Sequence, residues 1–262
     1  MSNPTPPHSE RRPVAYLNDK FLNSPDARAL RILAEFLEPL AHFRREKVRD
    51  TVVFFGSARL RENDGPLAEY YDHARVLARM LTEWSVQFTN GTYRFVVCSG
   101  GGPGIMEAAN RGASEAGGKT VGLNIGLPFE QFPNPYITPD LSFEFHYFFM
   151  RKFWFAYLAK ALVVFPGGFG TLDELMEILT LVQTQKLAKK MTVVLYGEAY
   201  WKEIINFDAL VRHRVIEQSD LDLIAFVDDP RSALDLLKSR ISIETAAPGD
   251  LPDFASSTRP PR

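Results

Sequence analysis

The sequence predicts a single α/β domain of the Rossmann-like, doubly wound type, in which helices flank a mainly parallel sheet. Short β-branched or aromatic runs alternate with helical patterns along the chain, as in a parallel sheet covered on both faces. Several of these runs are apolar without alternation, which is typical of strands buried on both faces. We expect strands at residues 51–55, 94–98, 120–124, 161–165, 192–196 and 223–227.

Helical patterns occupy most of the segments between these strands. The expected helices lie at residues 27–45, 67–84, 105–116, 143–160, 172–186, 200–218 and 230–240. Residues 1–14 and 246–262 are rich in Pro, Ser, Thr and Asp and are expected to be disordered tails, because they contain little apolar material. The domain is therefore predicted to span residues 15–245, without an internal repeat or boundary.

Composition and charge exclude several classes of protein. The 30 basic and 32 acidic residues give a net charge of −2, which does not favour nonspecific nucleic-acid binding. Cys98 is the only cysteine, and no His/Cys pattern has metal-ligand spacing, so we expect neither disulfides nor a metal site. No apolar stretch approaches the roughly 18 residues of a membrane helix, and the start lacks signal-peptide features. A cytoplasmic protein without membrane or nucleic-acid partners is expected.

Three of the predicted strands end in glycine-rich turns: Gly56-Ser57, residues 99–104 (SGGGPG) and residues 166–171 (PGGFGT). Ligands of doubly wound sheets bind at the carboxyl ends of strands, and glycine turns before helices expose backbone N–H groups to phosphate. One such turn could equally serve only to pack a helix on the sheet. Three such turns at the ends of strands in one sheet favour an anion-binding site. None ends in Gly-Lys-Ser/Thr, and none matches G-x-G-x-x-G closely, which disfavours P-loop and nicotinamide chemistry.

Glu174 is the first candidate for chemistry. It follows Thr171 with the spacing of a capping box, in which its side chain would bond back to the Thr171 amide. The same spacing places a carboxylate one helical turn from a phosphate-sized pocket, where it would meet the ribose of a nucleotide. Both interpretations stay open from the sequence.

Arg151 and Lys152 are the second candidates, because they lie in the aromatic segment 143–155 and buried cations need partners. They could extend to solvent or bridge Glu144; otherwise their partner is an acidic ligand or Glu174. In the same segment, His146 is expected to be a core histidine.

The motifs at residues 166–174 (PGGFGTLDE), 150–152 (MRK) and 100–106 (GGGPGIM) together resemble the LOG ("lonely guy") family over about residues 50–200. Members of that family, long mislabelled as lysine decarboxylases, are cytokinin riboside 5′-monophosphate phosphoribohydrolases, and many act on AMP. The resemblance implies hydrolysis of the N-glycosidic bond of a purine nucleoside 5′-monophosphate, releasing the base and ribose 5-phosphate. It also implies a small-molecule nucleotide substrate, no cofactor, and a homodimer or higher homo-oligomer.

By the same resemblance, Arg151 and Glu174 would be the catalytic pair. The residues expected to bind the nucleotide are Gly56, Ser57, Gly100, Gly101, Gly102, Gly104, Glu130, Met150, Lys152, Gly167, Gly168, Phe169, Gly170, Thr171, Leu172, Asp173 and Thr180. Two alternatives remain. A noncatalytic nucleotide-binding or sensing module could share the fold, and a decarboxylase would need a pocket lysine for pyridoxal phosphate, which the sequence does not indicate.

Overall fold

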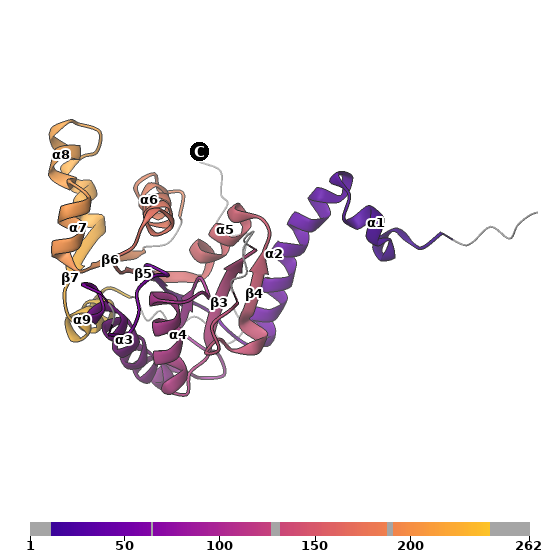
Figure 1. The fold of residues 1–262 in the computed structure, drawn as a ribbon, viewed down its shortest axis with the longest axis horizontal. Coiled ribbons are helices and arrows are strands. Elements are labelled where there is room, and N and C mark those ends of the chain that lie inside the picture. Colours follow the sequence, from indigo (N-terminus) through magenta and orange to yellow (C-terminus); the bar gives the residue numbers. More distant parts are fainter. Residues whose placement is uncertain (1–11, 64, 127–131, 188–190, 242–262) are drawn as a thin grey trace, which may run out of the picture.

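In a computed structural model, which describes residues 12–63, 65–126, 132–187 and 191–241, the chain forms a parallel sheet. The strand order is β4-β3-β2-β1-β5-β6-β7, and every pairing in this sheet is parallel (Figure 1). The predicted doubly wound fold is thereby confirmed. The strands are β1 (Thr51–Phe55), β2 (Val96–Ser99), β3 (Thr120–Ile125), β4 (Ser142–Phe145), β5 (Ala159–Val164), β6 (Thr192–Tyr196) and β7 (Ile224–Val227).

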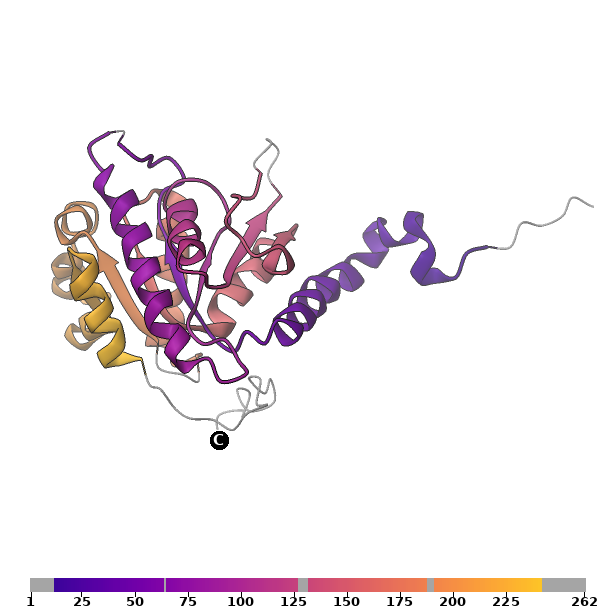
Figure 2. The same cartoon turned by 90° about the horizontal axis from the view of Figure 1, so that it is seen from below.

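Helices cover both faces of the sheet (Figures 1 and 2). Along β1, Val52 and Phe54 belong to one core cluster and Val53 and Phe55 to the other, because successive side chains of a strand point to opposite faces. The first cluster packs against α3 (Glu69–Ser85), α4 (Ile105–Glu115) and α9 (Pro230–Arg240). The second packs against α2 (Arg28–Arg45), α5 (Phe148–Leu158), α6 (Phe169–Gln183) and α7 (Glu198–Ile204). Shorter helices are α1 (Asp19–Leu22), α8 (Phe207–Arg212) and the 3₁₀ turns Ala15–Leu17, Pro25–Ala27, Val86–Phe88, Pro139–Leu141 and Gln218–Leu223.

Helix α2 extends away from the sheet and carries α1 at its outer end (Figure 2). Where α2 meets α5, the Phe36 and Trp154 rings lie 5.9 Å apart, and the Trp154 indole N–H donates to the Glu35 carbonyl over 3.0 Å. The Glu35 carboxylate accepts the backbone N–H groups of His146 and Tyr147, just before α5. These bonds fix the point at which α5 begins, and α5 carries Arg151 and Lys152.

The strands agree with the sequence predictions apart from β4. Strands β1 and β6 lie where they are expected, and the other four predicted strands differ by one or two residues at their ends. The helix expected at 143–160 is wrong at its start, because Ser142–Phe145 is strand β4 with alternating burial. The helix expected at 200–218 is interrupted near Asn206, whose side chain accepts the Ala209 N–H and caps α8.

The strand order brings the three glycine-rich turns together. Strand β1 lies between β2 and β5, and these are the three strands whose carboxyl ends carry those turns. The Ser57 N–H donates to the Pro166 carbonyl over 3.0 Å, and the Ile105 N–H donates to the Ser57 carbonyl over 3.1 Å. The first turn is therefore held by backbone bonds between the other two.

Gly104 shows how closely these turns approach one another. It has φ +71°, and a Cβ atom there would lie 2.3 Å from the Ser57 carbonyl oxygen. Gly117, after α4, has φ +72° but no heavy atom within 4 Å of its Cβ position. We expect Gly117→Ala to lower the free energy of unfolding by about 1 kcal/mol, the cost of the left-handed backbone alone. Gly104→Ala should cost at least about 2 kcal/mol more, because overpacking is added to the same strain.

Urea unfolding of the two variants beside the wild type measures this difference. Because φ is nearly equal at the two sites, equal losses would show that the contact between the turns at Gly104 and Ser57 contributes little.

Candidate active site

A cavity of about 910 Å³ lies at the carboxyl ends of β1, β2 and β5. In a doubly wound sheet this is the crevice at which the strand order reverses, and where ligands bind. Many of the residues predicted from the sequence line it: Gly56, Ser57, Gly100, Arg151, Gly167, Gly168, Phe169, Gly170, Thr171, Leu172, Asp173 and Glu174. The structure therefore collects, in one cavity, side chains and loops from widely separated parts of the chain.

Other predicted site residues lie away from this cavity lining. The carbonyls of Gly101 and Gly102 accept hydrogen bonds from the Asn134 side-chain amide at 3.0 and 3.1 Å, and these bonds hold this part of the second turn in place. Gly104 packs against Ser57, Met150 belongs to the core, and the Thr180 hydroxyl donates to the Met176 carbonyl. Lys152 is described below, and Glu130 lies outside the described residues.

Helix α6 begins at Phe169, with Gly168 as its N-cap residue and without a side-chain cap. The capping-box interpretation of Thr171 and Glu174 is therefore wrong, since Thr171 already lies within the first helical turn. The local pattern does not decide where the helix begins, because the preceding turn from Pro166 is held to Ser57 and to the Tyr200 hydroxyl, which donates to the Gly167 carbonyl. The Glu174 side chain is thereby freed from a capping role.

The glycines at the start of α6 leave room in the cavity. Gly168 and Gly170 have no heavy atom within 4 Å of their Cβ positions, and neither has a positive φ. Neither the backbone conformation nor packing within the chain requires glycine there. The backbone N–H groups of a first helical turn lack acceptors inside the helix, and the helix dipole places positive charge at the same end. This is the environment that binds a phosphate group.

Arg151 reaches the cavity from α5 and is fixed on two sides. Its Nε–H donates to the Leu123 carbonyl over 2.7 Å, and its guanidinium carbon lies 5.1 Å from the centre of the Phe155 ring. A Cβ at Gly100 would overlap the guanidinium, so this turn glycine makes room for it. Burial lowers the pKa of Arg151, and the charge of Glu174 partly opposes that effect. The guanidinium is therefore a rigid donor group in a site of low polarity.

Glu174 is the buried carboxylate of the site, with 8% of its surface exposed. Burial raises the pKa of Glu174 to about 7. The positive charges of Arg151 and Lys152 oppose this shift, and the negative charges of Glu177 and Asp173 reinforce it. A carboxyl group with a pKa near neutral pH can exchange a proton with water or substrate during a reaction.

Lys152 is directed toward α6 rather than into the cavity. Its ammonium group donates to Asp173 at 2.8 Å and forms an ion pair with Glu177 at 3.0 Å. Burial lowers the pKa of Lys152, but its contacts with the Asp173 and Glu177 carboxylates outweigh this effect, so the net shift is upward. The bridge to Glu144 considered from the sequence is replaced by these two carboxylates.

Several cavity residues have no counterpart in the sequence predictions. Arg59 comes two residues after the Gly56-Ser57 turn, and its backbone N–H donates to the Ser57 hydroxyl oxygen over 3.0 Å. A cation just after a glycine-rich turn at the end of a strand was the signal that could have identified it. Met106 and Pro166 belong to the motifs at 100–106 and 166–174 but were not among the residues expected to bind the nucleotide. The remaining lining residues lie outside the quoted motifs: Phe55, Ala58, Leu60, Leu67, Ile125, Phe148, Phe155, Tyr200 and Ile204. His146 is exposed, so the expectation of a core histidine is wrong.

Two further findings concern the described part of the chain only. No three His, Cys, Asp or Glu side chains gather there in a way that could hold a metal ion. Among the described helices, none has the length and apolar character needed to cross a membrane. Cys98 is buried in β2, and this burial raises the pKa of its thiol.

The raised pKa of Glu174 predicts a pH-dependent cost in stability. The unfolded carboxyl group has the lower pKa, so its contribution to folding is fully present below about pH 4.5 and is lost as pH rises through about 7. Glu174→Gln carries no charge at any pH. The difference in free energy of unfolding between this variant and the wild type should therefore shift in favour of the variant by about 2–3 kcal/mol from pH 5 to pH 8.

Urea unfolding of both proteins at the two pH values checks this. A difference between variant and wild type that stays constant with pH would mean that Glu174 does not titrate in this range.

Comparisons with known proteins identify a matching family model and related sequences. A family model described as "Possible lysine decarboxylase" matches residues 106–237. The chain is 28% identical over 166 residues to the rice (Oryza sativa subsp. japonica) cytokinin riboside 5′-monophosphate phosphoribohydrolase LOG, over 63% of this chain and 62% of that protein. It is 24% identical over 206 residues to the rice probable phosphoribohydrolase LOGL3, over 74% and 86% of the two chains. The chain thus spans about three fifths of the length of the first relative.

Solved structures show the same fold. A molybdenum cofactor binding protein from Rippkaea orientalis superposes with a TM-score of 0.51 at 19% identity, over 74% of this chain and 99% of the other. The structural genomics target TM1055 superposes with a TM-score of 0.50 at 22% identity, over 72% and 99%. Because the family model covers just over half of the 262 residues, the chain belongs to the LOG family.

Proposed function

We propose that the protein hydrolyses the N-glycosidic bond of a purine nucleoside 5′-monophosphate, with adenine or a cytokinin-type base, and releases ribose 5-phosphate. The observation that carries this proposal is the pairing of Arg151 and Glu174 in one cavity, beside the amino terminus of α6. The names of the rice relatives support the same reaction. A nucleotide substrate is further supported by a helix amino terminus, a carboxylate and a guanidinium that line the same cavity.

The phosphate of the nucleotide binds at the first turn of α6, where Gly168 and Gly170 leave space and backbone N–H groups point outward. The Ser57 hydroxyl oxygen accepts the Arg59 N–H, so its own proton is available to a ligand oxygen. Binding energy at the phosphate is remote from the reacting bond and positions the ribose. Adenosine, which lacks the phosphate, is expected to be a poor substrate.

Cleavage of the glycosidic bond builds positive charge on the ribose ring, as in glycoside hydrolysis. The Glu174 carboxylate stabilises that charge and orients or deprotonates the attacking water. The Arg151 guanidinium, held by the Leu123 carbonyl, fixes the ribose hydroxyls or assists departure of the base. Since only ionised Glu174 serves these roles, activity should rise with pH through the pKa of about 7.

A noncatalytic binding module is the second candidate, because a protein named for binding the molybdenum cofactor shares the fold. Arg151 and Glu174 favour the hydrolase, since binding an anion does not require a buried carboxylate. A decarboxylase dependent on pyridoxal phosphate fits poorly. Such an enzyme needs an unprotonated lysine, whereas the carboxylates around Lys152 raise its pKa.

The proposed reaction is tested by incubating the protein with 5′-AMP and measuring free adenine by chromatography. We expect adenine from AMP but not from adenosine. Glu174→Gln should lower kcat by about a hundredfold or more, because the amide can neither carry the charge nor accept a proton. If a panel of purine 5′-monophosphates, including N6-prenylated ones, releases no base, the hydrolase proposal fails and the binding module stands.

A second prediction concerns Arg59, which lines the cavity beside the proposed phosphate position. Arg59→Gln should raise the KM for AMP about tenfold, the loss of one charge-assisted contact, with kcat changed less than about twofold. Arg61→Gln is the matched control, since the Arg61 guanidinium donates to the carbonyls of Ala58 and Leu60 and lies outside the cavity lining. Equal KM values in the two variants would remove Arg59 from the phosphate site.

A further inference from the structure

The ion pair of Lys152 joins the two helices that carry the proposed catalytic pair. Lys152 belongs to α5, and its ammonium group contacts Asp173 and Glu177 on α6 at 2.8 and 3.0 Å. The lysine side chain is 18% exposed, and those of Asp173 and Glu177 are 57% and 35% exposed, so water screens the contact with Glu177 less than the contact with Asp173. Lys152 directly follows Arg151, and Asp173 directly precedes Glu174.

We propose that Lys152 is a positioning residue: by joining α5 to α6 through Asp173 and Glu177, it holds Arg151 and Glu174 in their working relation without contacting the nucleotide. This inference rests on the proposed function and assigns Lys152 a role different from the nucleotide contact that the family resemblance implies. Two carboxylates occupy its ammonium group, and it lies outside the cavity lining. A phosphate could engage it only by displacing one of them, at a cost in both desolvation and attraction.

The charges around Glu174 show what Lys152 does beyond holding the helices together. Asp173, Glu174 and Glu177 put three carboxylates on the second and third turns of α6. The cations that face them from α5 are Arg151 and Lys152, and both oppose the rise in the pKa of Glu174. On the β2 side, Cys98 is buried near Arg151. Without Lys152, Arg151 alone would oppose the effect of Asp173 and Glu177 on Glu174, and the carboxylate would form only at higher pH.

The test is the pH profile of kcat/KM for AMP. Lys152→Gln should move the midpoint of the acidic limb of this profile to higher pH, by about half to one pH unit. It should lower kcat at pH 7 about two- to fivefold, while the KM at high pH stays within about twofold. Lys152→Arg, which retains the charge, should keep the limb near its wild-type position. Glu177→Gln removes a negative charge and should move the limb downward. Combining Lys152→Gln with Glu177→Gln should return the limb toward the wild type.

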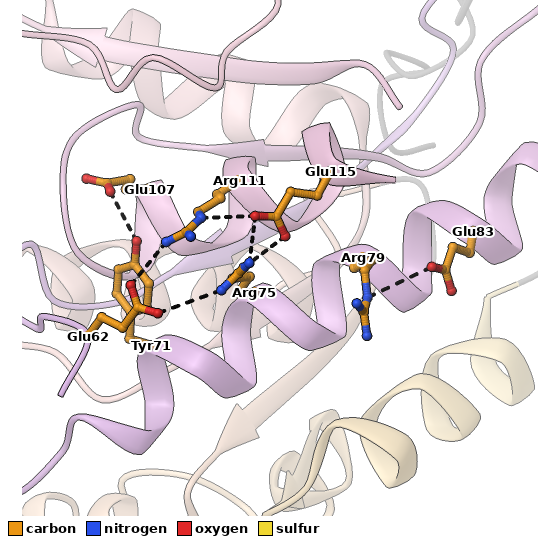
Figure 3. A network of polar contacts seen from close by, with 8 residues as sticks. All are labelled: Glu62, Tyr71, Arg75, Arg79, Glu83, Glu107, Arg111 and Glu115. Atoms are coloured by element: carbon orange, nitrogen blue, oxygen red, sulfur yellow. Dashed lines mark hydrogen bonds and ion pairs between the residues drawn. The ribbon is translucent and has the colours of Figure 1, made fainter. Parts of the chain in front are cut away.

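A matched control is available on the opposite face of the sheet. Arg75 on α3 contacts Glu115 on α4 at 2.7 Å and Glu62, in the loop before α3, at 3.7 Å (Figure 3). Like Lys152, it is a cation that joins two helices and contacts two carboxylates. Its side chain is 29% exposed, and it lies outside the cavity lining. Arg75→Gln should change the free energy of unfolding but leave the acidic limb in place, which separates a positional effect from general destabilisation.

Two results would overturn the proposal. If Lys152→Gln raises the KM for AMP at least tenfold with the limb unmoved, Lys152 contacts the nucleotide. If Lys152→Gln and Arg75→Gln give the same profile, the ion pair serves stability alone. Should the wild type release no base, the hydrolase proposal fails separately. The unfolding difference between wild type and Glu174→Gln then provides the readout, and its pH window should move upward in the Lys152→Gln background.

Discussion

The reversal of strand order at β1 is the constraint on which the site depends. The chain proceeds from β1 outward to β4 on one side, then returns across the sheet to place β5 on the other side of β1. Helices α3 and α4 therefore cover one face, and α5 and α6 the other. The crevice between these helices opens at the carboxyl edge of β1, and the turns that follow β1, β2 and β5 must line it. Residues far apart in sequence meet here because the topology leaves them no other position.

Burial then determines the chemistry available in this crevice. A carboxylate and a guanidinium removed from water interact over a lower effective dielectric, and each loses hydration that its neighbours only partly replace. Glu174 shows the result as a pKa near 7, and Arg151 as a pKa below its usual value. The carboxyl group is thereby poised to change its protonation state at neutral pH. Burial of these two charged groups also lowers the free energy of unfolding, and packing in the surrounding sheet must offset this cost.

Sequence patterns predicted those features that depend on local composition. The apolar runs of β1 and β6 end at glycines, so their bounds were predicted correctly. Strand β4 was missed because four residues next to an aromatic helix carry little signal, although the alternation of Phe143 and Phe145 with Glu144 was present. The partners of Lys152 could not be inferred, since Asp173 and Glu177 become neighbours only when α5 and α6 pack. The cavity residues Tyr200 and Ile204 come from α7, which no motif connects to the glycine turns.

Fold alone does not separate catalysis from binding, since a molybdenum cofactor binding protein shares this architecture. The energetics of Glu174 bear on the choice. A module that only binds a phosphate group gains nothing from an ionisable carboxyl group beside it: in its charged form this group repels the ligand, and burial makes that form costly. Glutamine would have nearly the same shape without either penalty. A reaction that develops positive charge on a sugar reverses this balance, because the charged carboxylate then interacts more strongly with the transition state than with the ground state. The buried charge at Glu174 is therefore better explained by turnover than by affinity.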